Sequence, residues 1–367
     1  MLFGEEQHRP YDRPPLSKQF LLGTRTSAEL ALREDPTIAD VEWRLGRRAT
    51  ACEAATRTLT LDDGSTEEFD GIVIATGAAP RRVPGSSLPG VHVLRTLDDA
   101  QALHADLARS PASVVVVGAG FVGQEVAATC RGLGLHVAMI ESVAPAAHVL
   151  GASIGQALAD IHRTRGVEIK LGVAVVAFEG QQRLEAITLS DGTTIDADVA
   201  VLGIGVTPNT GWLAGSGLTI EDGVVCDETC LAAPGIVAAG DVARWRNPRY
   251  GDLRRVEHWD NAVRQGEYAG RRLLATDGSV DLQPYAPVPW FWSDQYGLKL
   301  QLVGSTFRHD EVRIAAGSVA EERFVVLYRR GDRLVAALTL ASTSKLLKYR
   351  RLLEHNPSWD QALATDP

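Results

Sequence analysis

The feature that most constrains this chain is an internal repeat at a constant offset of 128 residues. Leu59–Ser65 and Phe69–Gly77 recur as Ile187–Thr193 and Ala197–Gly205, and each copy carries an Asp-Gly turn and a terminal Gly-x-x-Pro break. Each copy predicts a β-hairpin that leads into a buried strand ending at a glycine. We therefore expect two related nucleotide-binding units.

The second copy carries a complete dinucleotide-binding pattern. The β-branched run Ser113–Val117 predicts a buried parallel strand and leads into the GxGxxG sequence Gly118–Gly123. A helical run follows, and a second strand, His136–Ile140, ends at Glu141, 23 residues after Gly118. This combination of strand, glycines, helix, strand and acid predicts a Rossmann site.

Each of these residues has a predicted role. Gly118 permits the tight turn, Gly120 lets the pyrophosphate approach the backbone, and Gly123 lets the helix pack on the strand. The helix N-terminus favours the negative phosphates. Glu141 accepts hydrogen bonds from the adenosine ribose and repels a 2′-phosphate, so NADH is favoured over NADPH.

The first copy is incomplete, because its equivalent glycine loop would precede Met1. Leu2-Phe3 followed by Glu5 or Glu6 resembles the end of the second strand with its ribose acid. We expect a first unit truncated at its N-terminus. The start could lie upstream, another subunit could supply the piece, or the unit could be a remnant; a truncated or misassigned start is favoured.

Composition excludes several other classes of protein. Hydrophobic residues make up 45% and charged residues 23%, as in globular proteins, and no apolar run approaches the ~20 residues of a membrane span. Four cysteines without a CxxC pair argue against a disulfide framework or a redox pair, and scattered histidines argue against a metal site. A net charge of −9 argues against nucleic acid. We expect a cytoplasmic protein.

The motifs resemble those of the flavin-dependent ferredoxin reductases of bacterial oxygenase systems, the putidaredoxin reductase and biphenyl dioxygenase reductase type. The similarity covers nearly the whole chain. Five segments carry it: the flavin-side loop Pro10–Lys18, the crossovers Ala75–Gly77 and Gly205–Asn209, the second FAD motif Gly235–Asp241, and Pro289–Gln295, which opens a C-terminal domain.

The resemblance implies an α/β fold with two Rossmann-like domains in a glutathione-reductase-like plan, the FAD domain truncated, plus a C-terminal α+β domain. The expected domains are residues 1–100 and 223–282 for FAD, 101–222 for NAD, and 283–367 for dimerisation and ferredoxin docking. A homodimer is expected as well.

The resemblance also implies the site residues. For FAD they are Glu5, Arg13, Pro15, Lys18, Thr76, Gly77, Gly240, Asp241, Trp259 and Trp292. For NADH they are Gly118, Gly120, Phe121, Val122, Gly123, Glu125, Glu141 and Gly205. Lys18 would lie near flavin N5 and O4, and Glu125 at the nicotinamide end. Because Trp290 and Trp292 alternate along an extended segment, we expect them to face opposite sides.

The implied reaction is transfer of a hydride from NADH to FAD, followed by release of single electrons to an acidic 2Fe–2S ferredoxin. No side chain need act as an acid or base. From residue 283 on, eleven Lys and Arg residues stand against nine Asp and Glu, and Arg329, Arg330 and Arg333 are as consistent with docking as with a solvated face. The alternatives are an NAD-binding protein without flavin and a reductase of the rubredoxin or nitrite reductase type.

Overall fold

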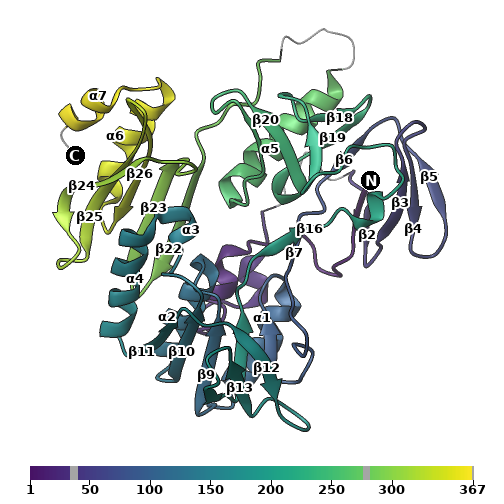
Figure 1. The fold of residues 1–367 in the computed structure, drawn as a ribbon. Helices are drawn as coiled ribbons and strands as arrows, with labels where there is room; N and C mark the ends of the chain where they lie inside the picture. Colours follow the sequence, from purple (N-terminus) through teal and green to yellow (C-terminus); the bar gives the residue numbers. More distant parts are fainter. Residues whose placement is uncertain (34–39, 276–281, 366–367) are drawn as a thin grey trace. The chain divides into compact units, whose positions relative to one another are not determined.

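The computed structural model describes residues 1–33, 40–275 and 282–365 of the chain. These residues form two compact units (Figure 1). Unit 1 comprises Met1–Asp12, Ala31–Ala79 and Thr207–Pro289, and unit 2 comprises Arg13–Leu30, Pro80–Val206 and Trp290–Pro367. Each is described by itself below. No helix within the described ranges is long and apolar enough to cross a membrane.

Unit 2 contains the predicted Rossmann domain. A fully parallel sheet has the order β11-β10-β9-β15-β8. The predicted strand, helix and second strand are confirmed as β9 (Ser113–Val117), α2 (Phe121–Gly132) and β10 (His136–Glu141). The other elements are β8 (Val91–Val93), α1 (Leu97–Leu107), α3 (Ala147–Leu150), α4 (Ala152–Thr164), β11 (Val167–Leu171) and β15 (Val199–Leu202). Val114–Val117 are buried because helices or loops cover both faces of this sheet.

The internal repeat appears as two matching antiparallel sheets. In unit 1, β3 (Ala49–Glu53), β4 (Thr58–Leu61) and β5 (Thr66–Glu68) pair in that order, and β6 (Ile72–Ile74) follows. In unit 2, β12 (Val175–Glu179), β13 (Ala186–Leu189) and β14 (Thr194–Asp196) pair likewise and lead to β15. The turn glycines Gly64 and Gly192 share a φ of 83°, which explains the Asp-Gly sequence in both copies.

The rest of unit 1 is built from short sheets around helix α5 (Trp259–Leu274). Strand β1 (Leu2–Gly4) pairs in parallel with β2 (Trp43–Leu45), and β6 pairs in parallel with β19 (Ile236–Ala238). Trp245 is completely buried in the core of this unit. The remaining strands are β17 (Val224–Cys226), β18 (Leu231–Ala233), β20 (Ala243–Asn247) and β21 (Asp252–Arg254). The crossover strands β7 (Ala78–Pro80) and β16 (Val206–Pro208) pair with each other.

The C-terminal part of unit 2 is an antiparallel sheet with the order β22-β23-β26-β25-β24. Its strands are β22 (Trp290–Gln295), β23 (Leu298–Gly304), β24 (Glu311–Ser318), β25 (Arg323–Arg330) and β26 (Arg333–Leu340), followed by α6 (Thr343–Glu354) and α7 (Trp359–Ala364). Phe291 and Leu302 share a core with Leu158 of α4, so one face of this sheet packs on the Rossmann domain.

The prediction that Trp290 and Trp292 face opposite sides is wrong. Their rings stack with centroids 5.2 Å apart and an interplanar angle of 26°. Residues i and i+2 of a strand share a face, and the intervening Phe291 points to the other one. The guanidinium of Arg350 on α6 lies 5.9 Å from the Trp290 ring, so both tryptophans belong to the α6 face.

Candidate cofactor site

The glycine loop after β9 has no room for side chains at two of its three glycines. A Cβ on Gly118, whose φ is 95°, would lie 2.4 Å from the Gly203 carbonyl oxygen, and one on Gly123 would lie 2.1 Å from the Gly118 carbonyl oxygen. A Cβ on Gly120 would have its nearest neighbour at 3.7 Å, and no side chain caps helix α2 there. The helix N-terminus is therefore open to a pyrophosphate, as a dinucleotide site requires.

The acid at the end of β10 is tied to this loop. Glu141 Oε2 accepts a hydrogen bond from the Ala119 amide at 2.9 Å, and Oε1 accepts one from the Ser142 amide at 2.8 Å. The carboxylate thus lies at the carboxyl edge of the parallel sheet, where a Rossmann acid meets the ribose. Val122 is exposed, whereas Phe121 packs its ring 4.5 Å from that of Phe291. Gly205 accepts a hydrogen bond from the Arg81 amide at 2.9 Å.

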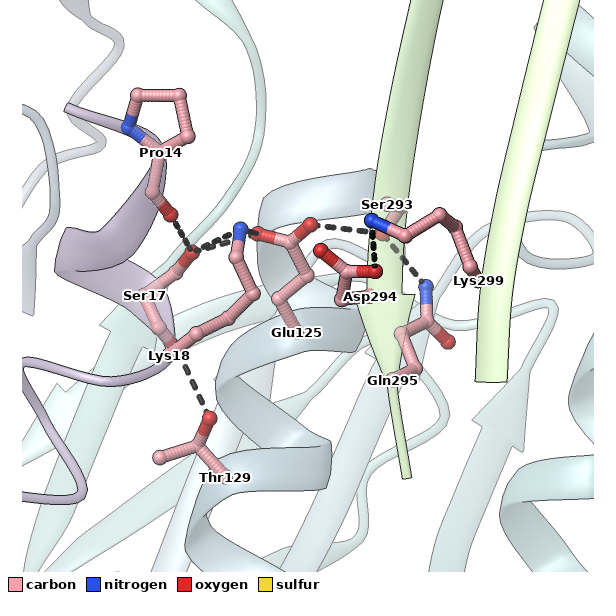
Figure 2. A network of polar contacts seen from close by, with 9 residues as sticks. All are labelled: Pro14, Ser17, Lys18, Glu125, Thr129, Ser293, Asp294, Gln295 and Lys299. Carbon is pink, nitrogen blue, oxygen red and sulfur yellow. Dashed lines mark hydrogen bonds and ion pairs between the residues drawn. The ribbon is translucent and has the colours of Figure 1, made fainter. Parts of the chain in front are cut away.

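A buried ion pair joins the flavin-side loop to the NAD helix (Figure 2). Lys18 Nζ lies 2.8 Å from Glu125 Oε2, and the two side chains are 10% and 7% exposed. Ser17 Oγ donates to the same oxygen at 2.5 Å, and Ser293 Oγ of β22 donates to Oε1 at 2.8 Å. Three segments far apart in the sequence therefore converge on one carboxylate, and the two residues expected to modulate the flavin are in contact.

Sequence reasoning missed Ser17 and Ser293. Ser17 ends the short 3-10 helix Pro14–Ser17, which is held against α2 by the hydrogen bond from Thr129 Oγ1 to the Ser17 carbonyl at 2.8 Å. Ser293 lies on the same buried strand face as Phe291, which the period-2 pattern predicts, but nothing in the sequence indicates that it meets Glu125. The neighbouring Arg13 donates to the Arg95 carbonyl at 2.8 Å, and Pro15 is buried.

Most of the other residues predicted to bind FAD lie in unit 1, in two separate places. Thr76 Oγ1 donates to the Asn209 carbonyl at 3.0 Å, and Asn209 Nδ2 donates to the Thr76 carbonyl at 2.9 Å, so both crossover motifs are joined. The Asn209 amide donates to the carbonyl of Gly77, also at 3.0 Å. Glu5 is exposed and lies 3.6 Å from an Arg48 nitrogen.

The second place is the 3-10 turn Gly240–Val242, which packs on α5. Gly240 has a φ of 74°, and its amide donates to Gln265 Oε1 at 3.0 Å. Asp241 is only 9% exposed, while Trp259 at the first position of α5 is 42% exposed. Burial lowers the pKa of His258 to about 4, against the opposing charge of Asp241, so this imidazole is neutral.

No side chain caps α5 at its N-terminus. Backbone donors of a helix start thus adjoin a buried carboxylate. This combination suits the pyrimidine carbonyls and ribityl hydroxyls of a flavin.

The four cysteines are buried free thiols. Burial raises the pKa of Cys130, Cys226 and Cys230 to about 12. Thiols in this state carry almost no thiolate at neutral pH, so they do not suit thiol–disulfide exchange.

Comparison with protein families now adds to the geometry. Residues 1–266 match the family described as pyridine nucleotide-disulphide oxidoreductase. The chain belongs to this family. Residues 290–367 of this oxidoreductase match a second family, described as reductase C-terminal.

Several relatives of this oxidoreductase are named. It is 36% identical to a 5,5′-dehydrodivanillate O-demethylase ferredoxin reductase subunit of Sphingobium sp., over 96% of this chain and 86% of the relative. It is 34% identical to putidaredoxin reductase of Pseudomonas putida, over 92% and 82%. A solved ferredoxin reductase from Rhodopseudomonas palustris superposes with a TM-score of 0.91 at 34% identity, covering 99% of this chain and 90% of that one.

Membership of this family confirms the predicted fold class and the predicted cofactors, FAD and NADH. The protein is an NAD(P)H-dependent flavoprotein oxidoreductase. The residues described above fit both cofactors. The glycine loop and Glu141 suit a dinucleotide, and Asp241 with the start of α5 suits a flavin. The bounds of the four predicted domain segments and the individual site assignments stay predictions.

Proposed function

We propose that this protein is an NADH:ferredoxin oxidoreductase of an oxygenase system. The observation that carries the proposal is the similarity to putidaredoxin reductase along almost the whole chain, including the C-terminal domain. A solved complex of putidaredoxin reductase with putidaredoxin also superposes on this chain, with a TM-score of 0.91 at 31% identity and 100% coverage. The buried thiols support the same conclusion, because thiols whose pKa is raised to about 12 do not suit a dithiol relay.

The chain's own residues would bind and orient rather than transfer protons. Gly118, Gly120 and Gly123 would hold the NADH pyrophosphate on the α2 N-terminus, and Glu141 would hold the ribose. When bound, FAD supplies the step from a two-electron donor to one-electron acceptors. Lys18 would place a positive charge beside the flavin and Glu125 would balance that charge, so the pair would set how strongly negative charge on the flavin is stabilised.

An acidic 2Fe–2S ferredoxin is the proposed partner, with helix α6 as its docking element. Lys348 and Arg351 of α6 are exposed, and the adjacent Leu347 is 56% exposed. Arg329 is less suited to docking than expected, because it pairs with Glu311 at 2.8 Å. A positive helix with an apolar side chain among its charges suits an acidic protein partner. The homodimer and the cytoplasmic location stay predictions.

The decisive experiment is NADH-driven reduction of cytochrome c by the purified FAD-loaded protein, with and without an added 2Fe–2S ferredoxin. We expect the ferredoxin to raise the rate at least tenfold. A rate equal to the ferredoxin-free control would contradict the proposal. NADH binding without any retained flavin would instead support the alternative of an NAD-binding protein.

A further inference from the structure

A chain of buried hydrogen bonds continues behind the Lys18–Glu125 pair into the C-terminal sheet. Ser293 Oγ, which donates to Glu125, accepts from Gln295 Nε2 at 3.1 Å. Gln295 Oε1 lies 3.0 Å from His162 Nε2 on α4, and His162 Nδ1 lies 2.7 Å from the Tyr296 hydroxyl. Ser293 and His162 are completely buried, and Gln295 is 7% exposed. Figure 2 shows the end of this chain at Glu125.

The direction of every bond in this chain is fixed by the carboxylate at its end. An ionised carboxylate only accepts, so the single Ser293 proton must point to Glu125 and Ser293 Oγ must accept from the amide nitrogen of Gln295. The amide oxygen of Gln295 then faces His162 and can only accept. His162 must therefore carry its proton on Nε2, which leaves Nδ1 to accept from Tyr296.

His162 meets this requirement because it is neutral. Burial lowers its pKa to about 4, an effect that the Arg165 charge reinforces and that the Gln295 hydrogen bond only partly opposes. A protonated imidazole would carry donors on both nitrogens and would remove the acceptor that Tyr296 faces.

The far end of the chain is anchored by the turn between β22 and β23. Tyr296 and Gly297 have φ values of 54° and 76°, as in a two-residue hairpin turn with both central residues left-handed. Tyr296 is not a glycine, so this conformation is strained. The Arg165 guanidinium lies 4.8 Å from its ring centroid and pairs with Glu322 at 2.5 Å. These contacts, with the hydrogen bond to His162, hold the residue in the strained turn.

We propose that Ser293, Gln295, His162 and Tyr296 are positioning residues, which hold the Glu125 carboxylate fixed in place as the partner of Lys18 during flavin reduction. The inference rests on the proposed function only in placing Lys18 beside the flavin. Every donor along the chain points toward Glu125, so the chain fixes the orientation in which this carboxylate meets Lys18. Without it, the Lys18 cation would be less well balanced and would stabilise negative charge on the flavin more strongly.

The test compares Ser293→Ala with Thr339→Val. Thr339 is a completely buried residue of β26 in the same sheet, and its hydroxyl has no hydrogen-bond partner among the described residues. Both variants delete one buried hydroxyl, but only the first touches Glu125. We expect S293A to shift the equilibrium between NADH and the enzyme-bound flavin at least threefold toward reduced flavin, measured spectroscopically by dye equilibration. T339V should leave this equilibrium unchanged. Ser293→Thr, which keeps a hydroxyl at this position, should give the equilibrium of the unaltered protein.

Equal equilibria in S293A and T339V would overturn the proposal. If S293A does not fold, Gln295→Met is compared with T339V instead, because it removes the next hydrogen bond in the series, from Gln295 to Ser293. The equilibrium is measured without ferredoxin, so a protein that fails to reduce any ferredoxin still gives this result. The two failures are therefore distinguishable.

A second readout needs no flavin chemistry. NMR of histidine-labelled protein should show His162 as the neutral Nε2–H tautomer, and Gln295→Met should abolish that preference. An Nδ1–H tautomer in the unaltered protein would refute the direction of the chain.

Discussion

At the scale of single residues, Gly123 is a predicted position of the NADH site that leaves no room for a side chain. Alanine there would place a Cβ 2.1 Å from the Gly118 carbonyl oxygen and push α2 away from β9. We expect Gly123→Ala to weaken NADH binding more than tenfold. The measurement is a fluorescence titration with NADH. Gly132→Ala at the other end of α2 is the control, because its Cβ would make an ordinary contact of 3.7 Å with Leu22. Unchanged affinity in Gly123→Ala would contradict the assignment of this loop.

We expect the preference between NADH and NADPH to be set at Glu141. Its carboxylate repels a 2′-phosphate, and the next residue, Ser142, donates to it and brings no positive charge. Glu141→Gln should therefore reduce the preference for NADH over NADPH about tenfold, measured as the ratio of kcat/KM values for flavin reduction. Glu168→Gln on neighbouring β11 removes an exposed carboxylate and should leave the ratio unchanged. If the ratio of kcat/KM values for NADH and NADPH changes equally in both variants, Glu141 has no specific role in cofactor preference.

At the scale of elements, helix α4 carries a pH-dependent contribution to stability. The pKa of His162 is about 4 in the folded protein, against an ordinary value near 6.5. The unfolded chain therefore takes up the proton first as the pH falls. The stabilisation is fully present above about pH 6.5 and is lost progressively down to about pH 4, by roughly 3 kcal/mol in all.

We expect the thermal midpoint to fall less between pH 7 and pH 5 in His162→Gln than in the unaltered protein. His258, which is also neutral with a pKa of about 4, contributes to the pH dependence of the thermal midpoint in both proteins. His136→Gln, at an exposed position, is the control and should retain the full slope. Equal slopes in His162→Gln and the unaltered protein would show that His162 does not titrate as its burial implies.

Elements were predictable from the sequence where a local pattern determines them. The strand Ser113–Val117, the glycine loop and the strand ending at Glu141 appear where expected, because β-branched runs and glycines specify conformation locally. Local pattern also contained the correct answer for β22, since residues i and i+2 share a strand face. The prediction that Trp290 and Trp292 face opposite sides was wrong because this rule of strand geometry was misapplied, although the sequence spacing of the two residues was known.

At the scale of the whole molecule, the sequence predicted two nucleotide-binding units but not the tertiary contacts that complete the site. Ser293 and Glu125 are 168 positions apart and meet only because β22 packs on α2. A lone serine in a strand carries no signal of such a partner. Pairing of this kind depends on long-range packing, which neither propensity nor spacing encodes.

Charge distribution over the whole molecule yields the last prediction. The net charge of −9 should repel the proposed acidic ferredoxin at long range, so we expect association to depend on a local positive surface, for which α6 is proposed. We expect Arg351→Glu on α6 to raise the KM for ferredoxin about tenfold at low salt, with flavin reduction by NADH unchanged. Because the screening length is about 8 Å at physiological ionic strength, the effect should shrink as salt is added. Arg109→Glu makes the same charge change at a 68% exposed side chain on the Rossmann domain and should have little effect. Equal increases of KM in the two variants would mean that total charge, and not docking at α6, governs association.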